Sequence, residues 1–222
     1  MPRLRVIVEG ATEESFINNV LAPTLWPFKV YAHAVTIGVP GHRGGRVNYA
    51  RYSKDVVTTL KQDQAIYCST LVDFYGLGAG FPGHPLPQNA SNLDKVRHLE
   101  SAVHKDIVGR IPDFQPDIRF IPYIQLHEYE GLLFSDPPAL AKALNQTSLT
   151  GKFQAVRDGF ATPEDINDDP KTAPSKRIIA FCAYLKVIDG TNAAKAVGLQ
   201  RMRTECPHFD EWVGKLEVLP EL

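Results

Sequence analysis

The strongest constraint on the fold is a junction between a strand and a helix at the start of the chain. Residues 3–8 form a short apolar, β-branched run that stops at Glu9 and Gly10, a pattern typical of a buried strand. Thr12 then offers an N-cap for a helix over residues 12–21, whose first turn carries acids where the helix dipole favours them. Glu9 is therefore expected at the carboxyl end of a strand, where open α/β sheets place their chemistry. An acid that serves only to cap the helix would explain the same residues.

The alternation of strand and helix patterns continues along the first part of the chain. Further strands are predicted over residues 28–35, 66–72 and 118–124, and helices over residues 49–61 and 93–107. Helical connections of this length imply parallel strands joined by right-handed crossovers. Pro122 places the last strand at an edge or ends it early. We therefore predict that residues 1–135 form an α/β core, with a mostly parallel central sheet flanked by helices.

The pattern changes after Pro137 and Pro138. Short helices are predicted over residues 139–145, 151–158, 175–187, 191–198 and 207–216, interrupted by an acidic loop over residues 162–170. We expect residues 136–222 to form a C-terminal helical extension packed on the core rather than an independent domain.

Composition limits the class of protein. The chain has 222 residues, of which 44% are apolar, and this suits one α/β domain. A net charge of −1 excludes a globally basic nucleic-acid coat, so a polyanion must bind at a local patch. Cys68, Cys182 and Cys206 contain no C-x-x-C pair and indicate reduced thiols. Without a signal peptide or the roughly 20 apolar residues that span a bilayer, a cytoplasmic protein with no membrane partner is expected.

Acidic residues end three of the four predicted strands. Glu9 and Asp73 follow the first and third strands, and Glu128 and Glu130 lie just past the fourth. The carboxyl ends of parallel strands share one edge of a sheet, so these side chains are expected to be neighbours. Crowded carboxylates repel one another unless a cation holds them, and Mg²⁺ prefers oxygen ligands. The pattern predicts metal-assisted phosphodiester cleavage, although any one of these acids alone would more commonly cap a helix.

The densest basic stretch follows the second predicted strand and includes a glycine-rich loop. His42, Arg43, Arg46 and Arg51 belong to it, and such side chains give salt-dependent phosphate contacts. Because the loop follows a strand, we expect it to face the acidic edge and to bind substrate phosphates. The alternative is a solvated loop and helix face.

Other motifs are weaker. Lys176 and Arg177 open a predicted helix and could bring a cation to a scissile phosphate, but a surface pair fits equally well. Residues 78–83 match G-x-G-x-x-G, yet the prolines that follow forbid the helix that a dinucleotide site requires. No glycine loop ends in the Lys-Ser/Thr of a P-loop, so this chain is not expected to hydrolyse ATP. His127 could be a proton shuttle, or a structural histidine.

These residues carry a resemblance to a known family. Val8-Glu9-Gly10-x-Thr12-Glu13 and the acidic strand end Leu71-Val72-Asp73 resemble a Toprim domain, most closely those of the overcoming-lysogenisation-defect nuclease group. The motifs Gly-His-Arg-Gly-Gly, Val-Asp-Phe-Tyr-Gly, His-Glu-Tyr-Glu-Gly-Leu-Leu-Phe-Ser, Pro-Glu-Asp-Ile-Asn, Pro-Ser-Lys-Arg and Cys-Pro-His-Phe extend the similarity over essentially the full length, to a bacterial family of stand-alone Toprim-like proteins.

The resemblance implies roles for individual residues. Glu9 would ligate metal and transfer a proton, Asp73 would ligate metal, and Glu13 would assist. Proteins of this group are often encoded beside ABC- or SMC-type ATPases in anti-phage systems, which implies an ATPase partner, and they often work as dimers. The chain departs from the Toprim pattern at Tyr75, where that pattern has a second aspartate, so Glu128 or Glu130 would have to replace it.

The leading hypothesis is a Mg²⁺- or Mn²⁺-dependent nuclease that acts on DNA or RNA, tRNA included. In it Glu9, Asp73 and Glu128 form the metal site and Lys176 assists the chemistry. The rival hypothesis, favoured by Tyr75, is a catalytically silent Toprim-like module that binds its ATPase or a nucleic acid. A small-molecule phosphotransfer enzyme is a further alternative.

Overall fold

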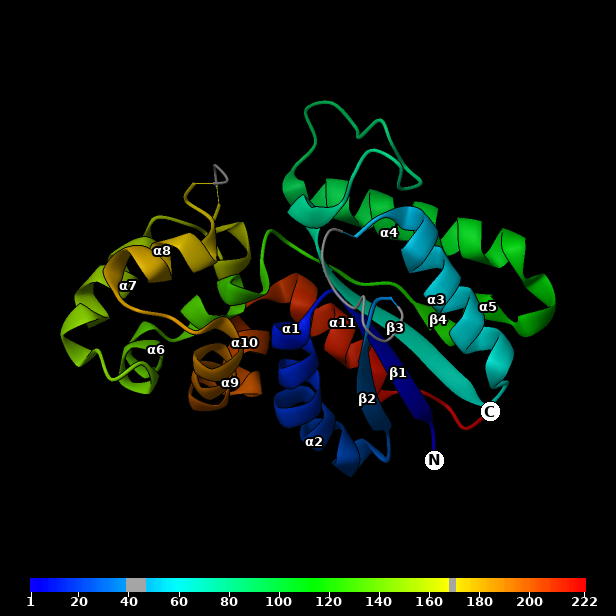
Figure 1. Ribbon diagram of the computed structural model, residues 1–222, viewed down its shortest axis with the longest axis horizontal. Coiled ribbons are helices and arrows are strands. Elements are labelled where there is room, and N and C mark those ends of the chain that lie inside the picture. Colours follow the sequence, from blue (N-terminus) through cyan, green and yellow to red (C-terminus); the bar gives the residue numbers. More distant parts are fainter. Residues whose placement is uncertain (39–46, 168–170) are drawn as a thin grey trace.

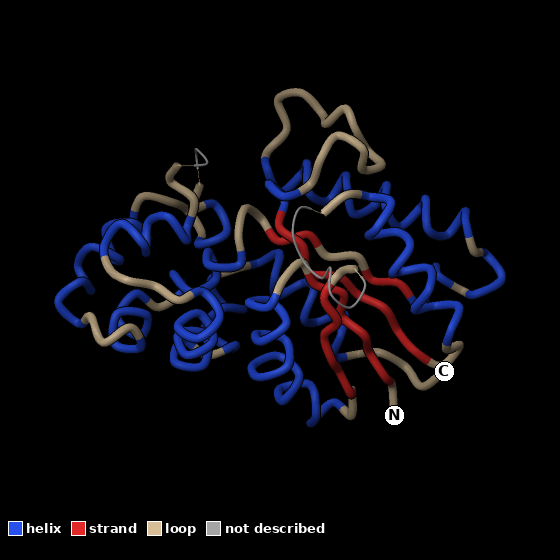
Figure 2. The backbone as a smooth tube through the Cα atoms, viewed as in Figure 1, coloured by secondary structure: helices blue, strands red, loops and turns tan. Residues whose placement is uncertain are grey.

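The computed structural model describes residues 1–38, 47–167 and 171–222. Within them, the strands form one parallel sheet in the order β2-β1-β3-β4, with β5 paired to the end of β3. The strands are β1 (Arg3–Val8), β2 (Tyr31–Thr36), β3 (Ile66–Asp73), β4 (Phe120–Ile121) and β5 (Ile124–Gln125). Helices pack around this sheet (Figures 1 and 2). The predicted fold class, an α/β core with a mostly parallel sheet and a helical C-terminal region, is confirmed.

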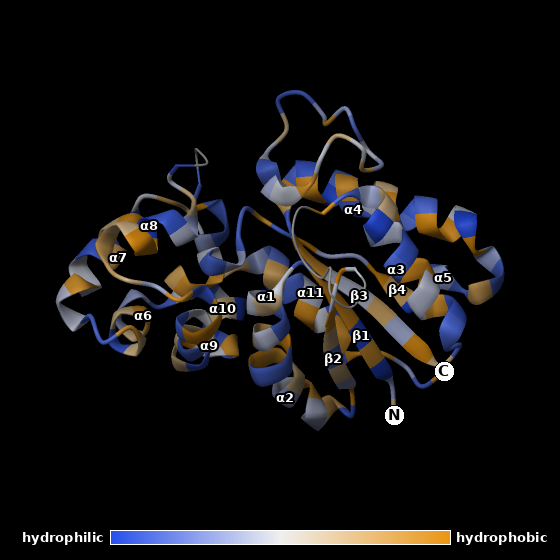
Figure 3. Cartoon of the chain, viewed as in Figure 1, coloured by the Kyte–Doolittle hydropathy of each residue, from blue (hydrophilic) through white to orange (hydrophobic). Residues whose placement is uncertain are grey.

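The central strands are buried on both faces, which explains their nearly continuous apolar sequences. On β1, Val6 and Val8 belong to one hydrophobic cluster, and Ile7 belongs to the other. Helices α3 (Tyr49–Gln62) and α4 (Asn92–Arg110) supply the second cluster. In Figure 3 both helices carry hydrophobic and hydrophilic stripes, as expected for helices that cover a sheet face.

The first helical segment is longer than predicted. Helix α1 (Ala11–Phe16) continues through a π-helical turn, η1 (Ile17–Leu21), into α2 (Ala22–Leu25) and a 3₁₀ turn, η2 (Trp26–Phe28). The prediction that the helix ends before Pro23 was wrong, because that proline lies in the first turn of α2, where the wider π turn accommodates it. The π turn also presents Asn18, whose Oδ1 accepts a hydrogen bond (2.9 Å) from the amide of Ala34 on the edge strand β2.

The fourth predicted strand is interrupted. A 3₁₀ turn, η4 (Pro112–Phe114), and a short helix, α5 (Pro116–Arg119), precede β4, and two residues separate β4 from β5. The strand predicted over residues 118–124 therefore begins two residues late. The prediction that Pro122 places it at an edge and ends it early is confirmed, because Pro122 has no amide for the ladder. The Thr70 side chain of β3 bonds the backbone between β4 and β5. Its hydroxyl accepts a hydrogen bond from the Tyr123 amide (3.1 Å) and donates one to the Tyr123 carbonyl oxygen (3.2 Å).

The region after β5 is helical. It contains the 3₁₀ segments η5 (Tyr129–Ser135), η6 (Thr147–Leu149) and η7 (Pro163–Asp165), and the helices α6 (Pro137–Ala143), α7 (Thr150–Asp158), α8 (Pro174–Phe181), α9 (Lys186–Val197), α10 (Leu199–Glu205) and α11 (Pro207–Glu217). The single helix predicted over residues 175–187 is instead two helices. Helices α6 to α10 form a lobe beside the sheet, whereas α11 packs against it (Figure 1). Trp212 of α11 donates to Ser69 of β3 (2.9 Å), so the two regions share one core.

No helix in the described residues combines the length and apolar character needed to cross a membrane.

Candidate active site at the carboxyl edge of the sheet

Five carboxylates gather at the edge where β1, β3 and β5 end. The strands are parallel, with Val8 opposite Leu71 and Asp73 opposite Gln125, so their carboxyl ends coincide. Burial raises the pKa of Asp73 well above its ordinary value, and the charges of the other four acids raise it further. We call this set the acidic cluster; its members are Glu9, Glu13, Asp73, Glu128 and Glu130.

Glu9 is half-buried and packs against a glycine from the segment after β3. Burial raises the pKa of its carboxyl group; the peptide group of Asp73 and the charge of Lys186 oppose the shift. A Cβ atom added at Gly76, in the 3₁₀ turn η3 (Phe74–Gly76), would lie 3.1 Å from Glu9 Oε2. A side chain at that position would therefore displace the carboxylate.

Two members of the acidic cluster are anchored by backbone amides. Oε2 of Glu13 accepts from the amide of Gly10 (3.0 Å), the N-cap residue of α1. Oε2 of Glu128 accepts from the amide of Ser175 (3.0 Å) at the start of α8. These carboxylates thus hold the strand-to-helix turn and the helical extension in place.

A cation from the extension pairs with one of these acids. Lys186 Nζ lies 3.3 Å from Oε1 of Glu130, whose side chain is 2% exposed. Burial raises the pKa of Glu130 to about 7, although Lys186 opposes the shift. Burial alone would lower the pKa of Lys186, but Glu130, Glu128 and Asp73 together raise it. Lys186 lies in the first turn of α9, where the helix dipole disfavours a cation, so it is the acids that make this position favourable.

The acidic cluster has the ligand chemistry that a hard cation prefers, but its side chains are not arranged as a complete coordination site. Among residues 1–38, 47–167 and 171–222, no three His, Cys, Asp or Glu groups are already placed around one metal position. Glu9 Oε2 and Asp73 Oδ1 are nevertheless buried with no hydrogen-bond partner in that part of the chain, which is costly for carboxylate oxygens. Oxygen donors of this type fit Mg²⁺ or Mn²⁺.

The predicted basic site residues lie outside the acidic cluster or outside the described residues. Lys176 is exposed on the first turn of α8, one residue beyond the amide that binds Glu128. Arg177 donates to the Thr172 carbonyl oxygen (2.6 Å), and its guanidinium group lies 5.3 Å from the centre of the Phe160 ring. Arg51 is half-buried in the first turn of α3. The remaining three predicted phosphate contacts, His42, Arg43 and Arg46, lie outside the described residues.

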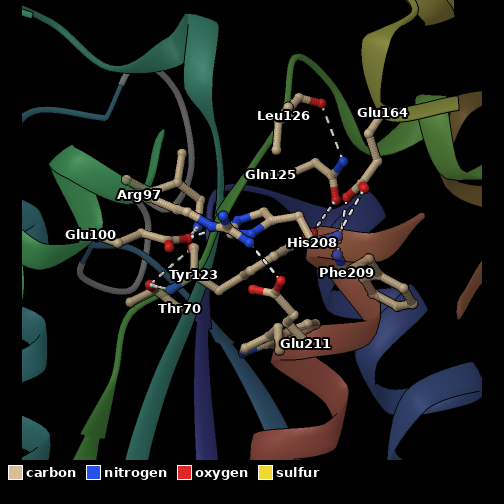
Figure 4. Close-up of polar contacts among 12 residues, drawn as sticks. Thr70, Arg97, Glu100, Tyr123, Gln125, Leu126, Glu164, His208, Phe209 and Glu211 are labelled. Carbon is tan, nitrogen blue, oxygen red and sulfur yellow. Dashed lines mark hydrogen bonds and ion pairs between the residues drawn. The ribbon is translucent and has the colours of Figure 1, made fainter. Parts of the chain in front are cut away.

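Sequence reasoning overlooked Lys186 and a second polar cluster. Nothing in the local pattern singles out Lys186, because the helix predicted over residues 175–187 places it in a last turn, where a lysine is ordinary. The second cluster lies where α11 meets the sheet (Figure 4). There Glu164 accepts from the amides of His208 and Phe209 (3.0 Å each), and the His208 ring pairs with Glu100 (3.0 Å). Both carboxylates are thereby engaged in tying α11 to the core.

A pocket of about 400 Å³ lies beside this second cluster. Its lining combines the edge strand β4 with side chains of α4 and α11, including Arg97 and Glu211. These two are paired with each other at 2.5 Å. The pocket therefore offers no uncompensated charge from this pair, in contrast to the acidic cluster.

Comparison with known proteins assigns a family and no activity. A family model described as a domain of unknown function, DUF4276, matches residues 8–217. Neither a curated protein nor a solved structure matches the chain.

Proposed function

Because the chain belongs to the DUF4276 family, whose description names no activity, we propose a function from the site alone: metal-dependent hydrolysis of phosphodiester bonds in nucleic acid. The observation that carries the proposal is the acidic cluster, in which buried oxygens of Glu9 and Asp73 lack a hydrogen-bond partner within the described residues. Raised carboxyl pKa values mean that these groups resist ionising together, and a divalent cation removes that penalty. The proposal also draws on the sequence resemblance to Toprim nucleases.

Glu9 and Asp73 would hold the metal, and Glu128 or Glu130 would complete its ligand set. When bound, Mg²⁺ or Mn²⁺ would polarise the phosphate and lower the pKa of a bound water. Attack of water on phosphorus breaks one P–O ester bond, and the proton released by the water passes to Glu9. The leaving oxygen takes its proton from solvent.

Lys186 would supply positive charge to the substrate. A compact ammonium group beside the acidic cluster can contact a non-bridging phosphate oxygen and stabilise the charge that develops during cleavage. Lys176, the residue favoured by sequence, lies at the same end of α8 as the Ser175 amide that binds Glu128 and is a second candidate for this contact.

Glu13 would act indirectly. Its carboxylate is hydrogen-bonded to Gly10, the residue after Glu9, so it sets the turn that aims Glu9. We therefore propose that Glu13 assists the metal site by positioning Glu9.

The partner and pathway proposals rest on the resemblance to overcoming-lysogenisation-defect proteins. They are an ABC- or SMC-type ATPase partner, a role as effector in anti-phage defence, and a homodimer. A catalytically silent binding module is the second candidate function. Two observations favour it: Tyr75 occupies the position of the second Toprim acid, and the described donors are not preassembled around a metal.

Cleavage assays separate the two candidates. Labelled DNA, RNA and tRNA are incubated with Mg²⁺ or Mn²⁺ and either wild type, Glu9→Gln or Asp117→Asn, with and without the ATPase. Asp117 is an exposed acid on α5, next to the start of β4 and so at the other end of the strands. Cutting by wild type and Asp117→Asn, lost in a folded Glu9→Gln, supports the nuclease. No cutting by any variant on any polymer supports the silent module.

A further inference from the structure

An exposed aromatic ring stands beside the acidic cluster. Tyr75 follows Asp73 by two residues and is 49% exposed. Its ring stacks on the ring of His127, with 4.8 Å between centroids and 19° between planes. His127 immediately precedes Glu128 and is 1% exposed. The stacked pair therefore joins the two segments that carry Asp73 and Glu128.

The backing ring is buried and contacts Asn92. His127 has a φ of 63°, in the left-handed region that few non-glycine residues adopt. Its Nε2 atom lies 3.5 Å from the side-chain nitrogen of Asn92. Non-glycine residues with such backbone conformations are concentrated at functional sites. A buried, oriented imidazole gives Tyr75 a rigid support, which lowers the entropy lost when a flat group stacks on it.

Two exposed apolar residues lie close to Lys186 in sequence. Leu185 and Ile188 are 65% and 61% exposed on either side of Lys186 in sequence. The charge of Lys186 acts on both Glu9 and Glu130, so these side chains extend from the same segment that reaches the acids. Nucleobases contact aromatic and aliphatic surfaces of this kind, here close to the proposed site of phosphodiester cleavage.

We propose that Tyr75, supported by His127, is a stacking platform for a nucleobase adjacent to the cleaved phosphate, and that the substrate is single-stranded or locally unpaired nucleic acid. This inference rests on the proposed nuclease function and specifies its substrate. A base can lie on the tyrosine face only after leaving its own stack, which single strands and loops allow and an intact duplex does not. Stacking tolerates any base, so the platform selects for strand state rather than sequence.

The test measures binding and cutting separately. Fluorescence anisotropy follows labelled 20-nucleotide DNA and RNA single strands, and the same sequences as duplexes, in Ca²⁺ to limit turnover. The variants are Tyr75→Ala, Tyr75→Phe and the control Tyr31→Ala, since Tyr31 is 55% exposed at the opposite end of the strands. We expect Tyr75→Ala to weaken single-strand binding about tenfold, the size of one base–aromatic contact. Tyr75→Phe and Tyr31→Ala should bind as wild type does.

A probe inside the strand reports the contact itself. A single-stranded oligonucleotide carrying 2-aminopurine should show a fluorescence change on binding wild type that Tyr75→Ala loses, while melting curves confirm that both proteins are folded. Equal affinity of wild type and Tyr75→Ala, or a duplex bound as tightly as a single strand, would overturn the platform. If the protein cuts nucleic acid but binding does not depend on Tyr75, the nuclease proposal stands and the platform proposal fails. If binding depends on Tyr75 but no cutting occurs, the platform proposal stands and the nuclease proposal fails. No binding and no cutting overturns both.

Discussion

Nζ of Lys186 lies 3.3 Å from Oε1 of Glu130, so a cation from the helical extension reaches a carboxylate that is 2% exposed at the end of the sheet. The two residues are 56 positions apart in sequence. This pair connects the extension to the chemistry proposed for the core.

Lys186→Met should lower cutting by roughly 10²–10³-fold, the effect of removing one electrostatic contact to a transition state. Single-turnover cleavage rates measure it. Lys195→Met, an exposed lysine in the last turn of the same helix, should cut at the wild-type rate. An unchanged rate in Lys186→Met would assign the role to another cation, with Lys176→Met as the next variant.

The same substitution should change stability in a pH-dependent way. Without Lys186 the pKa of Glu130, already raised to about 7 by burial, rises further. Below pH 6 Glu130 is neutral with or without Lys186, so the loss is small. At pH 8 the variant must either keep a proton on Glu130 or bury its charge without a partner, and both are costly. Melting temperatures of the metal-free protein at pH 6 and pH 8 test this. An equal decrease at both values would contradict it.

Asp73→Asn should stabilise the metal-free protein and abolish its response to metal. Removing one acid from the acidic cluster relieves repulsion among the others. The free energy of unfolding should rise by about 1 kcal/mol, which raises the melting temperature by roughly 2–4 °C. Wild type should gain about 2.7 kcal/mol from Mg²⁺ at one hundred times its dissociation constant. Thermal melts with and without Mg²⁺ measure both effects. A wild type insensitive to Mg²⁺ and Mn²⁺ would argue against the metal site.

Stability should decrease as pH rises from about 5 to 8. Burial raises the pKa of Glu164 to about 7, outweighing the two amides that donate to it. The folded state therefore binds more protons than the unfolded state between pH 4.5 and 7, and stability falls there by up to about 3 kcal/mol. Burial lowers the pKa of His208, but Glu100 raises it more, so its pairing energy is likewise lost above pH 6.5.

Urea unfolding from pH 4.5 to 8.5 measures this dependence. Glu164→Gln should be closest to wild type at pH 5, where Glu164 is itself protonated and so resembles glutamine, and its pH slope should be flatter. A slope identical to that of wild type would contradict the raised pKa.

Arg119→Met should destabilise the fold without changing the acidic cluster. The guanidinium group is 1% exposed and donates to the carbonyl oxygens of Ile66, Phe114, Leu60 and Asp63. Leaving those acceptors unpaired should cost about 3–5 kcal/mol. Arg97→Met breaks only an exposed ion pair and should cost about 0–1 kcal/mol. Urea unfolding compares the two variants.

Local sequence determined the sheet and the convergence of its acids. The predicted strands over residues 3–8 and 66–72 match β1 and β3 within one residue, and the helix over residues 49–61 matches α3. Their signals are β-branched runs and helical periodicity, which depend on near neighbours. Because the strands are parallel, Glu9 and Asp73 had to lie along one edge of the sheet, and they meet there because β1 and β3 are neighbours.

Tertiary structure alone decided what surrounds those acids. The lysine beside Glu130, the Ser175 amide on Glu128 and the tie from Glu164 to α11 all join residues more than 40 positions apart. Such contacts depend on how the helical extension packs, and packing is set by the shapes of buried side chains from many elements at once. No periodicity in a single segment encodes that information. Residues 3–8 could therefore predict where Glu9 lies, but only the folded chain showed which cation reaches the cluster it belongs to.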